Sequence, residues 1–257
     1  MSLRKFCNYD LPGMPPVLAW NPIAMRCTPV DDGCRNCWHL KMANRLMKNP
    51  KIDALNRESY KDGRVRATNG TLKTALPTEP RIVAVQFMGD LWHRKISEEK
   101  RLGIIATCRA NARHIFLMLT KRPERVTEEF PDNVWLGTSV HDQASADKRI
   151  PELLKAKCRH KWLSIEPMLG EADLTAAFCF IDKNGEPCGS PCVEWVACGA
   201  ETGAGARPCH PDWIAAVASR CEWNGIPFYD KRDPSAAGFT RREYPIEWAE
   251  KLKGNTK

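Results

Sequence analysis

The sequence predicts an α/β fold in which parallel strands alternate with helices and build a full or partial (β/α) barrel. Two observations support this prediction. Helix-like stretches lie between short apolar runs, and the runs are almost continuously apolar, as in parallel strands buried on both faces. The runs are residues 17–20, 81–87, 114–119, 134–137, 161–165, 195–198 and 226–229.

Three stretches have the pattern of helices. Residues 37–47 place apolar side chains on one stripe and basic side chains elsewhere, which is the spacing of an amphipathic helix. Ser97 can cap a second helix that runs to about residue 112. A third apolar stripe covers residues 213–221, and Gly225 would end that helix.

The chain length is compatible with one domain. Its 257 residues are 43% apolar, which is enough for one sizeable core. We therefore predict a single barrel-like domain over residues 1–257, with irregular insertions near residues 49–80 and 175–191.

Composition narrows the functional classes. No apolar window approaches the roughly 18 residues of a membrane helix, and the first residues lack the apolar core of a signal peptide, so we expect a cytoplasmic protein without a membrane partner. The twelve cysteines then favour metal binding over disulfides. A net charge of +8 favours anionic partners such as nucleotides or nucleic acid.

Polar residues follow six of the predicted strands. Enzymes with parallel (β/α) architecture build their active sites at the carboxyl ends of the strands, so these residues are expected to share one rim. An ordinary strand-to-loop transition explains any one of them equally well. They are Met88-Gly89-Asp90, Thr120-Lys121-Arg122, Thr138-Ser139-Val140-His141-Asp142, Glu166-Pro167, Gly199-Ala200-Glu201 and Asp230-Lys231-Arg232.

The cysteines of the segment RCTPVDDGCRNCW are the strongest candidates for chemistry. Cys27, Cys34 and Cys37 lie between the first predicted strand and the first predicted helix. Three thiolates can hold three irons of a [4Fe–4S] cluster and leave the fourth iron open. S-adenosylmethionine (SAM) is the molecule that uses such an open position for radical chemistry.

Two other hypotheses use the same cysteines. A structural zinc site would need a fourth ligand, and the candidates are His39 or the distant Cys188 and Cys192. A redox Cys-x-x-Cys at a helix start explains Cys34 and Cys37 but leaves Cys27 without a role.

Several longer motifs carry a resemblance to a known family. They are WNPIAMRCTPVDDGCRNCW, FMGDLWH, LTKRPERV, VWLGTSVHDQASADKRIPELL, SIEPMLG and CGAETGAGARPCHPDW, spread over residues 20–231. Together they resemble the phage-associated three-Cys-motif family of unknown function, which is similar to radical SAM enzymes. The resemblance implies a radical-SAM-like barrel, a [4Fe–4S] cluster, SAM as cofactor and a separate partner protein.

The cysteine spacing departs from that of ordinary radical SAM enzymes. They use C-x3-C-x2-C with an aromatic residue before the last cysteine, whereas this chain has C-x6-C-x2-C with Trp38 after it. The added residues lengthen a loop and leave three thiolates able to meet one cluster. By the same resemblance Gly89 and Asp90 would hold the methionine amino group of SAM. Candidates for its ribose and carboxylate are Ser139, Asp142, Glu166 and Glu201.

Further candidates are open to two interpretations. Lys121 and Arg122 could hold a substrate phosphate, or they could form a solvated helix start. His141 could carry a proton, although a hydrogen-bonded loop histidine is the favoured interpretation. An auxiliary metal could bind among five other cysteines, although their irregular spacing favours unligated thiols; these are Cys179, Cys188, Cys192, Cys198 and Cys209.

These observations predict a radical SAM-like enzyme that generates a 5′-deoxyadenosyl radical to modify or repair a nucleotide or nucleic-acid base. Its electron donor is not indicated by the sequence. The alternative is a zinc-stabilised nucleic-acid-binding protein without turnover.

Overall fold

The computed structural model describes residues 3–6, 9–62, 66–67, 75–178, 192–232 and 241–253. Its strands, in chain order, are β1 (Arg4–Lys5), β2 (Leu18–Trp20), β3 (Ile23–Ala24), β4 (Arg66–Ala67), β5 (Ile82–Val85), β6 (Ile115–Thr120), β7 (Val134–Val140), β8 (His160–Ile165), β9 (Trp195–Cys198) and β10 (Phe228–Asp230). Its helices are α1 (Trp38–Leu46), α2 (Ala54–Asp62), α4 (Glu98–Ala110), α5 (Gln143–Lys155), α6 (Thr175–Phe178), α7 (Pro211–Trp223) and α9 (Ile246–Lys253), with short 3-10 turns η1 (Asp32–Cys34) and η2 (Pro123–Arg125).

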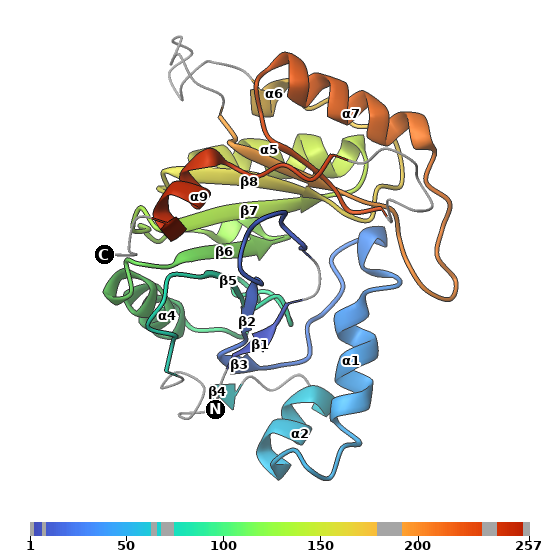
Figure 1. Ribbon diagram of the computed structural model, residues 1–257. Coiled ribbons are helices and arrows are strands. Elements are labelled where there is room, and N and C mark those ends of the chain that lie inside the picture. The colour runs from blue at the N-terminus through green and yellow to red at the C-terminus, as the bar shows by residue number, and fades with distance from the viewer. Residues whose placement is uncertain are drawn as a thin grey trace.

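One eight-stranded sheet forms the centre of the molecule (Figure 1). Its strand order is β1-β2-β5-β6-β7-β8-β9-β10, and all pairs from β2 to β10 are parallel. β1 pairs antiparallel with β2, and β3 and β4 form a separate two-stranded sheet. The predicted α/β class is confirmed. Among the described residues the large sheet is open, with β1 and β10 as its edges.

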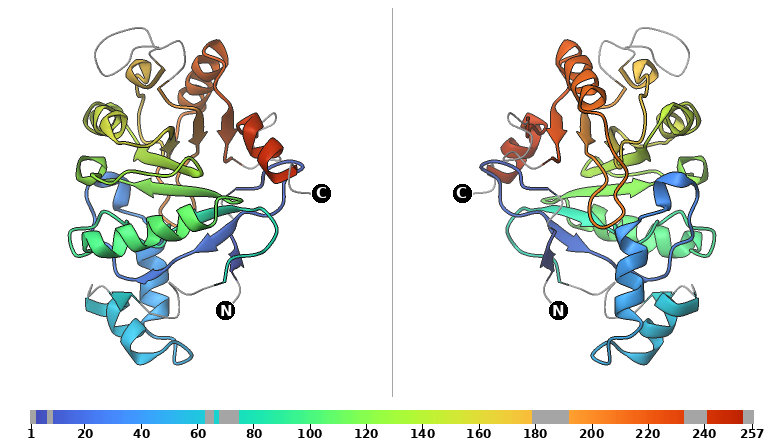
Figure 2. Two further views of the ribbon diagram at one scale, coloured as in Figure 1. Left: turned by 90° about the vertical axis from the view of Figure 1, so that its left-hand side faces the viewer. Right: turned by 90° about the vertical axis from the view of Figure 1, so that its right-hand side faces the viewer.

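The two faces of the sheet are buried by different elements. Along β5, Val83 and Val85 face a core layer to which α4, α5, α6 and α7 contribute buried side chains. Ile82 and Ala84 alternate to the other face, as the period of a strand requires. Figure 2 shows α4, α5 and α7 along one side of the sheet. Burial of both faces explains why the predicted strands are continuously apolar.

Aromatic side chains fill the second face. Tyr9, from the segment before β2, packs with ring centroids 5.2 Å from Trp195 and 5.5 Å from Tyr229. Trp248 of α9 lies 4.9 Å from the Trp195 ring and is fully buried. These rings give the strands a rigid backing, because aromatic groups bury large apolar areas in fixed geometry.

The expectation of irregular structure at residues 49–80 is wrong in part, because α2 and β4 lie there. Asp53 caps α2 by accepting hydrogen bonds from the backbone N–H groups of Leu55 and Asn56, at 2.8 and 3.3 Å. Residues of α2 are mostly polar, so no apolar stripe marked the helix. The cap was the signal in the sequence.

The insertion predicted near residues 175–191 begins with the single turn α6, and residues 179–191 lie outside the described residues. Of the described helices, none combines the length and apolar character that a bilayer crossing demands.

Gly137 of β7 tests the packing of the sheet. It pairs with Trp162 of β8, and a methyl group at this position would overlap the Trp162 indole. We expect Gly137→Ala to lower the free energy of unfolding by about 1–3 kcal/mol through overpacking, measured by urea denaturation. Gly103→Ala, on the exposed side of α4 with open space around it, is the matched control. It should stabilise by about 0.5–1 kcal/mol, and equal effects of the two changes would contradict the packing.

Buried histidines predict acid sensitivity. Burial lowers the pKa of His114 to about 4, and burial likewise lowers those of His39 and His93 to about 4. Below the unfolded-state pKa of about 6.5 the unfolded chain binds more protons, so stability falls as the pH drops from 6.5 towards 4. His114→Gln should reduce this slope by up to about 1.4 kcal/mol per pH unit, measured by denaturation across that range. An unchanged slope in His114→Gln would contradict the assignment of this acid sensitivity to the buried His114 ring.

Candidate functional site

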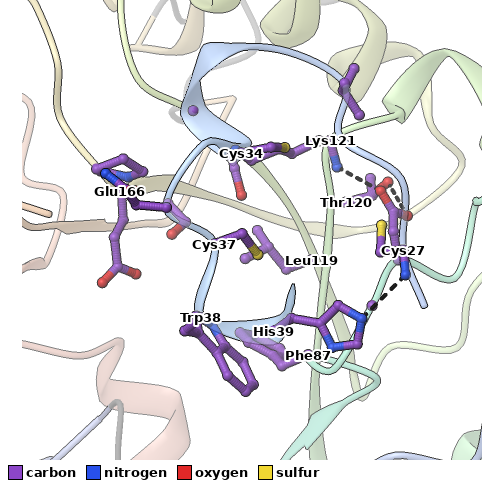
Figure 3. A pocket seen from close by; sticks show the side chains of 18 of the residues that line it. Cys27, Cys34, Cys37, Trp38, His39, Phe87, Leu119, Thr120, Lys121 and Glu166 are labelled. Atoms are coloured by element: carbon purple, nitrogen blue, oxygen red, sulfur yellow. Dashed lines mark hydrogen bonds between the residues drawn. The ribbon is translucent and has the colours of Figure 1, made fainter. Parts of the chain in front are cut away.

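The three candidate cysteines come from one loop at the carboxyl edge of the sheet. Cys27 follows β3, Cys34 ends η1, and Cys37 occupies the N-cap position of α1. All three line the same pocket, together with residues that follow β5, β6, β8 and β9. Figure 3 shows the thiol groups around this pocket, with Lys121 beside Cys34. The predicted convergence of the cysteines on this edge of the sheet is confirmed.

Two backbone features bring the cysteine loop close to β5. Gln86 has a left-handed backbone (φ 55°), and its side-chain amide both accepts from and donates to the backbone of Ile23, each at 2.9 Å. At Gly89 (φ 131°), a Cβ atom would lie 2.7 Å from Met25 Sδ. A glycine is therefore required where the segment before Cys27 passes the end of β5.

Basic side chains clamp the loop between Cys27 and Cys37. Arg149 of α5 is buried, pairs with Asp31, and donates to the Ser139 carbonyl at 2.7 Å. Arg207 donates to Asp32 at 2.6 Å. Because η1 is the only regular element that the structure describes between Cys27 and Cys37, these contacts from outside hold the loop in place.

Cations also face the thiols. Lys121 Nζ lies 3.6 Å from Cys34 Sγ, and Arg122 Nη1 lies 3.9 Å from Cys27 Sγ. Burial and the Asp90 carboxylate raise the pKa of Cys27, and Arg122 lowers it; together they leave this pKa at about 11. A bound metal would reverse this balance, since a coordinating thiol is deprotonated outright. Without a metal, Cys27 is therefore a neutral thiol at neutral pH.

Asp90 lies at the centre of a hydrogen-bond network. Its Oδ1 accepts from Thr120 Oγ1 at 2.7 Å, and its Oδ2 accepts from Arg122 Nη1 at 2.8 Å. Asp90 therefore orients Arg122 towards the pocket. Its predicted contact with a cofactor ammonium stays a prediction, and such a group would share Oδ2 with Arg122.

Three further predicted residues line the pocket: Ser139, Glu166 and Glu201. Glu166 pairs with Lys231. Arg207 makes two side-chain hydrogen bonds to Glu201 and holds the pKa of that carboxyl at about 2. Glu201 also accepts from Asn36 at 2.9 Å, which links the loop after β9 to the cysteine loop. Their contacts with ribose or carboxylate groups remain predictions.

His141 and Asp142 are not among the residues that line the pocket. Asp142 caps α5 by accepting from Ser145 N at 2.8 Å. His141 is buried behind the cysteine loop, where burial lowers its pKa. Its ring lies close enough to Gly33 that a Cβ there would be 2.9 Å from His141 Nδ1. Both positions favour structural roles.

His39 supports the cysteine loop. Its Nε2 accepts a hydrogen bond from the backbone N–H of Cys27 at 3.2 Å. That contact occupies the nitrogen lone pair that a zinc ion would need. The sequence indicated His39 only as a possible zinc ligand and did not reveal its hydrogen bond to the Cys27 backbone.

The pocket has apolar walls that sequence reasoning also missed. Phe87 and Leu119, each at the end of a strand, line it with Trp38, whose side chain is 43% exposed. The cavity has a volume of about 190 Å³, more than ten times what a single water requires. The space beside the thiols therefore accepts a group much larger than a lone ion.

The geometry distinguishes between metals. Tetrahedral zinc, with Zn–S bonds of about 2.3 Å, places its thiolates about 3.8 Å apart. Among the described residues, Cys27, Cys34 and Cys37 do not form a group whose sulfurs all lie within 4.8 Å of one another. A [4Fe–4S] cluster binds its thiolates on different irons and spaces them more widely. As they stand in the described part of the chain, the three sulfurs are not all as close together as the ligands of one tetrahedral zinc ion.

Three of the five cysteines considered for an auxiliary metal lie in the described part of the chain. Cys198 is buried, whereas Cys192 and Cys209 are partly exposed, and none of the three lines the cysteine pocket. Cys179 and Cys188 lie outside the described residues. That these cysteines are unligated thiols stays a prediction.

Fold and site together define an α/β protein with a cysteine-lined pocket at the carboxyl edge of a parallel sheet. Residues 17–255 match the family described as a protein of unknown function, DUF5131, and the chain belongs to that family. Comparisons with curated proteins and with solved structures give no match. Function must therefore be inferred from the chemistry of the site.

Arg149 provides a direct test of how the loop is held. We expect Arg149→Met to leave Asp31 without its buried partner and to loosen the loop, so that iodoacetamide alkylates buried Cys34 about tenfold faster, equivalent to about 1.4 kcal/mol. Peptide mass spectrometry of quenched samples measures the rate.

Lys155→Met is the matched control, because it removes a positive charge from the exposed side of the same helix. It should leave Cys34 as slow as in the wild type. Equal rates in Arg149→Met and wild type would show that Asp31 does not anchor the loop.

Proposed function

We propose that this protein is a radical SAM-like iron–sulfur enzyme that modifies or repairs a nucleotide or a nucleic-acid base. The observation that carries the proposal is the convergence of three thiols from one loop on a pocket that basic side chains face and that has room for a further group. Three cysteines beside an open cavity suit a cluster that leaves one iron available to a small molecule.

Strand order supports a partial (β/α) barrel. The parallel strands β2, β5, β6, β7, β8, β9 and β10 follow one another in space as they do in the sequence. In barrels of this kind the active site lies at the carboxyl ends of the strands, which is where the cysteine pocket lies.

In the proposal, Cys27, Cys34 and Cys37 hold the cluster. When bound and reduced by one electron, the cluster supplies cleavage of SAM to methionine and a 5′-deoxyadenosyl radical, which takes a hydrogen atom from the substrate. Lys121 and Arg122 balance the negative charge of the thiolates. Phe87 and Leu119 exclude water from the neighbouring space.

Charge and an exposed ring support a nucleic-acid substrate. The chain carries a net charge of +8, and Lys121 and Arg122 contribute positive charge to the pocket lining. Trp38 combines pocket lining with 43% exposure, as suits a ring on which a base can stack. An enzyme acting on a duplex would also extrude the base. A separate protein and a one-electron donor complete the proposed system.

Anaerobic reconstitution tests the proposal. We expect full-length protein treated with iron and sulfide to hold about four irons per chain and, with dithionite and SAM, to release 5′-deoxyadenosine, measured by mass spectrometry. Cys27→Ser, Cys34→Ser and Cys37→Ser should each lose most of the iron and at least a hundredfold of this product.

Cys209→Ser is the control, because Cys209 is a partly exposed thiol outside the pocket. It should retain both iron and product. A colourless protein that holds one zinc through these three cysteines and binds nucleic acid without SAM would replace this proposal with the zinc alternative.

A further inference from the structure

A second group of side chains that could bind a metal lies at the amino ends of β8 and β9, opposite the cysteine pocket. His160 opens β8, Glu194 immediately precedes β9, and Glu247 belongs to the first turn of α9. One ligand atom from each lies within 4.8 Å of the other two. In Figure 1, α9 covers the sheet well away from α1 and the cysteine loop. Three separate elements therefore bring one imidazole and two carboxylates together.

The histidine is held firmly in place. Its ring stacks on Trp135 with a centroid distance of 4.5 Å and an interplanar angle of 7°. Its Nδ1 lies 2.9 Å from Glu194 Oε2. Two ligand atoms that each lie about 2.1 Å from one ion are roughly 3 Å apart. The imidazole and the Glu194 carboxylate are therefore as close as two ligands of the same ion.

The surrounding cavity is negative. Four carboxylates line it against two basic side chains, Arg159 and Lys251. Arg159 forms an ion pair with Asp132, with 3.7 Å between Arg159 Nη1 and Asp132 Oδ2, and both side chains are exposed. Within the ligand group Glu194 pairs with His160. The four carboxylates of the cavity outnumber its two lysine and arginine side chains, which favours a cation and disfavours an anion.

An unpartnered donor in the same cavity provides an independent observation. Trp248 lines the cavity, is fully buried, and its Nε1 has no hydrogen-bond acceptor in the described part of the chain. Buried indole N–H groups usually find a partner. A cation cannot accept this hydrogen bond, but a water carried by the cation can.

We propose that His160, Glu194 and Glu247 bind a first-row divalent transition-metal ion that fastens α9 to the starts of β8 and β9. The donor set of one imidazole and two carboxylates suits ions such as Zn²⁺, with Mn²⁺ bound more weakly. Because Glu247 and buried Trp248 are adjacent on α9, the ion stabilises the docking of that helix. This site is independent of the cysteine pocket and of the function proposed for it.

Calorimetric titration of Zn²⁺ tests the site. The full chain carrying Cys27→Ser, Cys34→Ser and Cys37→Ser is used, so that zinc cannot bind the cysteine loop. We expect one Zn²⁺ per chain and a rise in melting temperature on binding. Glu247→Gln in this background should weaken binding at least tenfold and abolish the rise.

Glu250→Gln is the matched control, because Glu250 lines the same cavity from the same helix but lies outside the ligand group. It should bind Zn²⁺ within twofold of its parent. Equal weakening by both changes would indicate general attraction by acidic side chains and would overturn the proposal, as would a parent that binds no better than Glu247→Gln.

A second measurement does not require the serine variants. Mn²⁺ has little preference for thiolates, so uptake by the wild-type chain is followed through loss of the free-ion electron paramagnetic resonance signal. We expect one Mn²⁺ per chain, lost in Glu247→Gln and retained in Glu250→Gln. Identical uptake by wild type and Glu247→Gln would equally overturn the proposal.

Discussion

The ion pair between Arg149 and Asp31 is the contact on which the cysteine site most depends. Arg149 of α5 is buried, and burial lowers its pKa to about 10, so that it still carries its charge at neutral pH. Asp31 lies beside this charge and offsets the cost of burying it. The loop from Cys27 to Cys37 has few contacts of its own, and ion pairs from neighbouring elements define its path. In any other position of the loop, Arg149 would be a buried charge without its partner, which costs free energy. The ion pair therefore favours one position of the loop.

The same arrangement produces a positive environment around sulfur. Arg122 is directed by Asp90 towards Cys27, while Lys121 reaches Cys34 from the adjacent residue of the loop after β6. Asp90 accepts hydrogen bonds from Thr120 and Arg122, and so it holds these side chains in position. Lys121 and Arg122 place positive charge beside sulfur, which suits thiolates that bind a metal.

Aromatic packing supports the strands between their carboxyl ends, where the cysteine pocket lies, and their amino ends. Tyr9, Trp195 and Trp248 form a continuous layer over the face opposite α4, α5 and α7. Because a close-packed interior deforms little, this aromatic layer fixes both ends of the strands that it covers. The cysteine pocket at the carboxyl ends and the ligand group at the amino ends thus share one rigid support.

Periodicity in the sequence determined the strands, the α/β class and the place of Cys27, Cys34 and Cys37 between a strand and a helix, because these depend on neighbouring residues. It did not reveal β1, β3 and β4, which are too short, or α2, which is too polar, to carry an apolar pattern. The helices α5, α6 and α9 were not predicted either. The roles of Asp90, His39 and Arg149 were decided only by tertiary structure. Arg149 meets Asp31 across 118 positions of the chain, and no local pattern records which buried charges the folded backbone brings together.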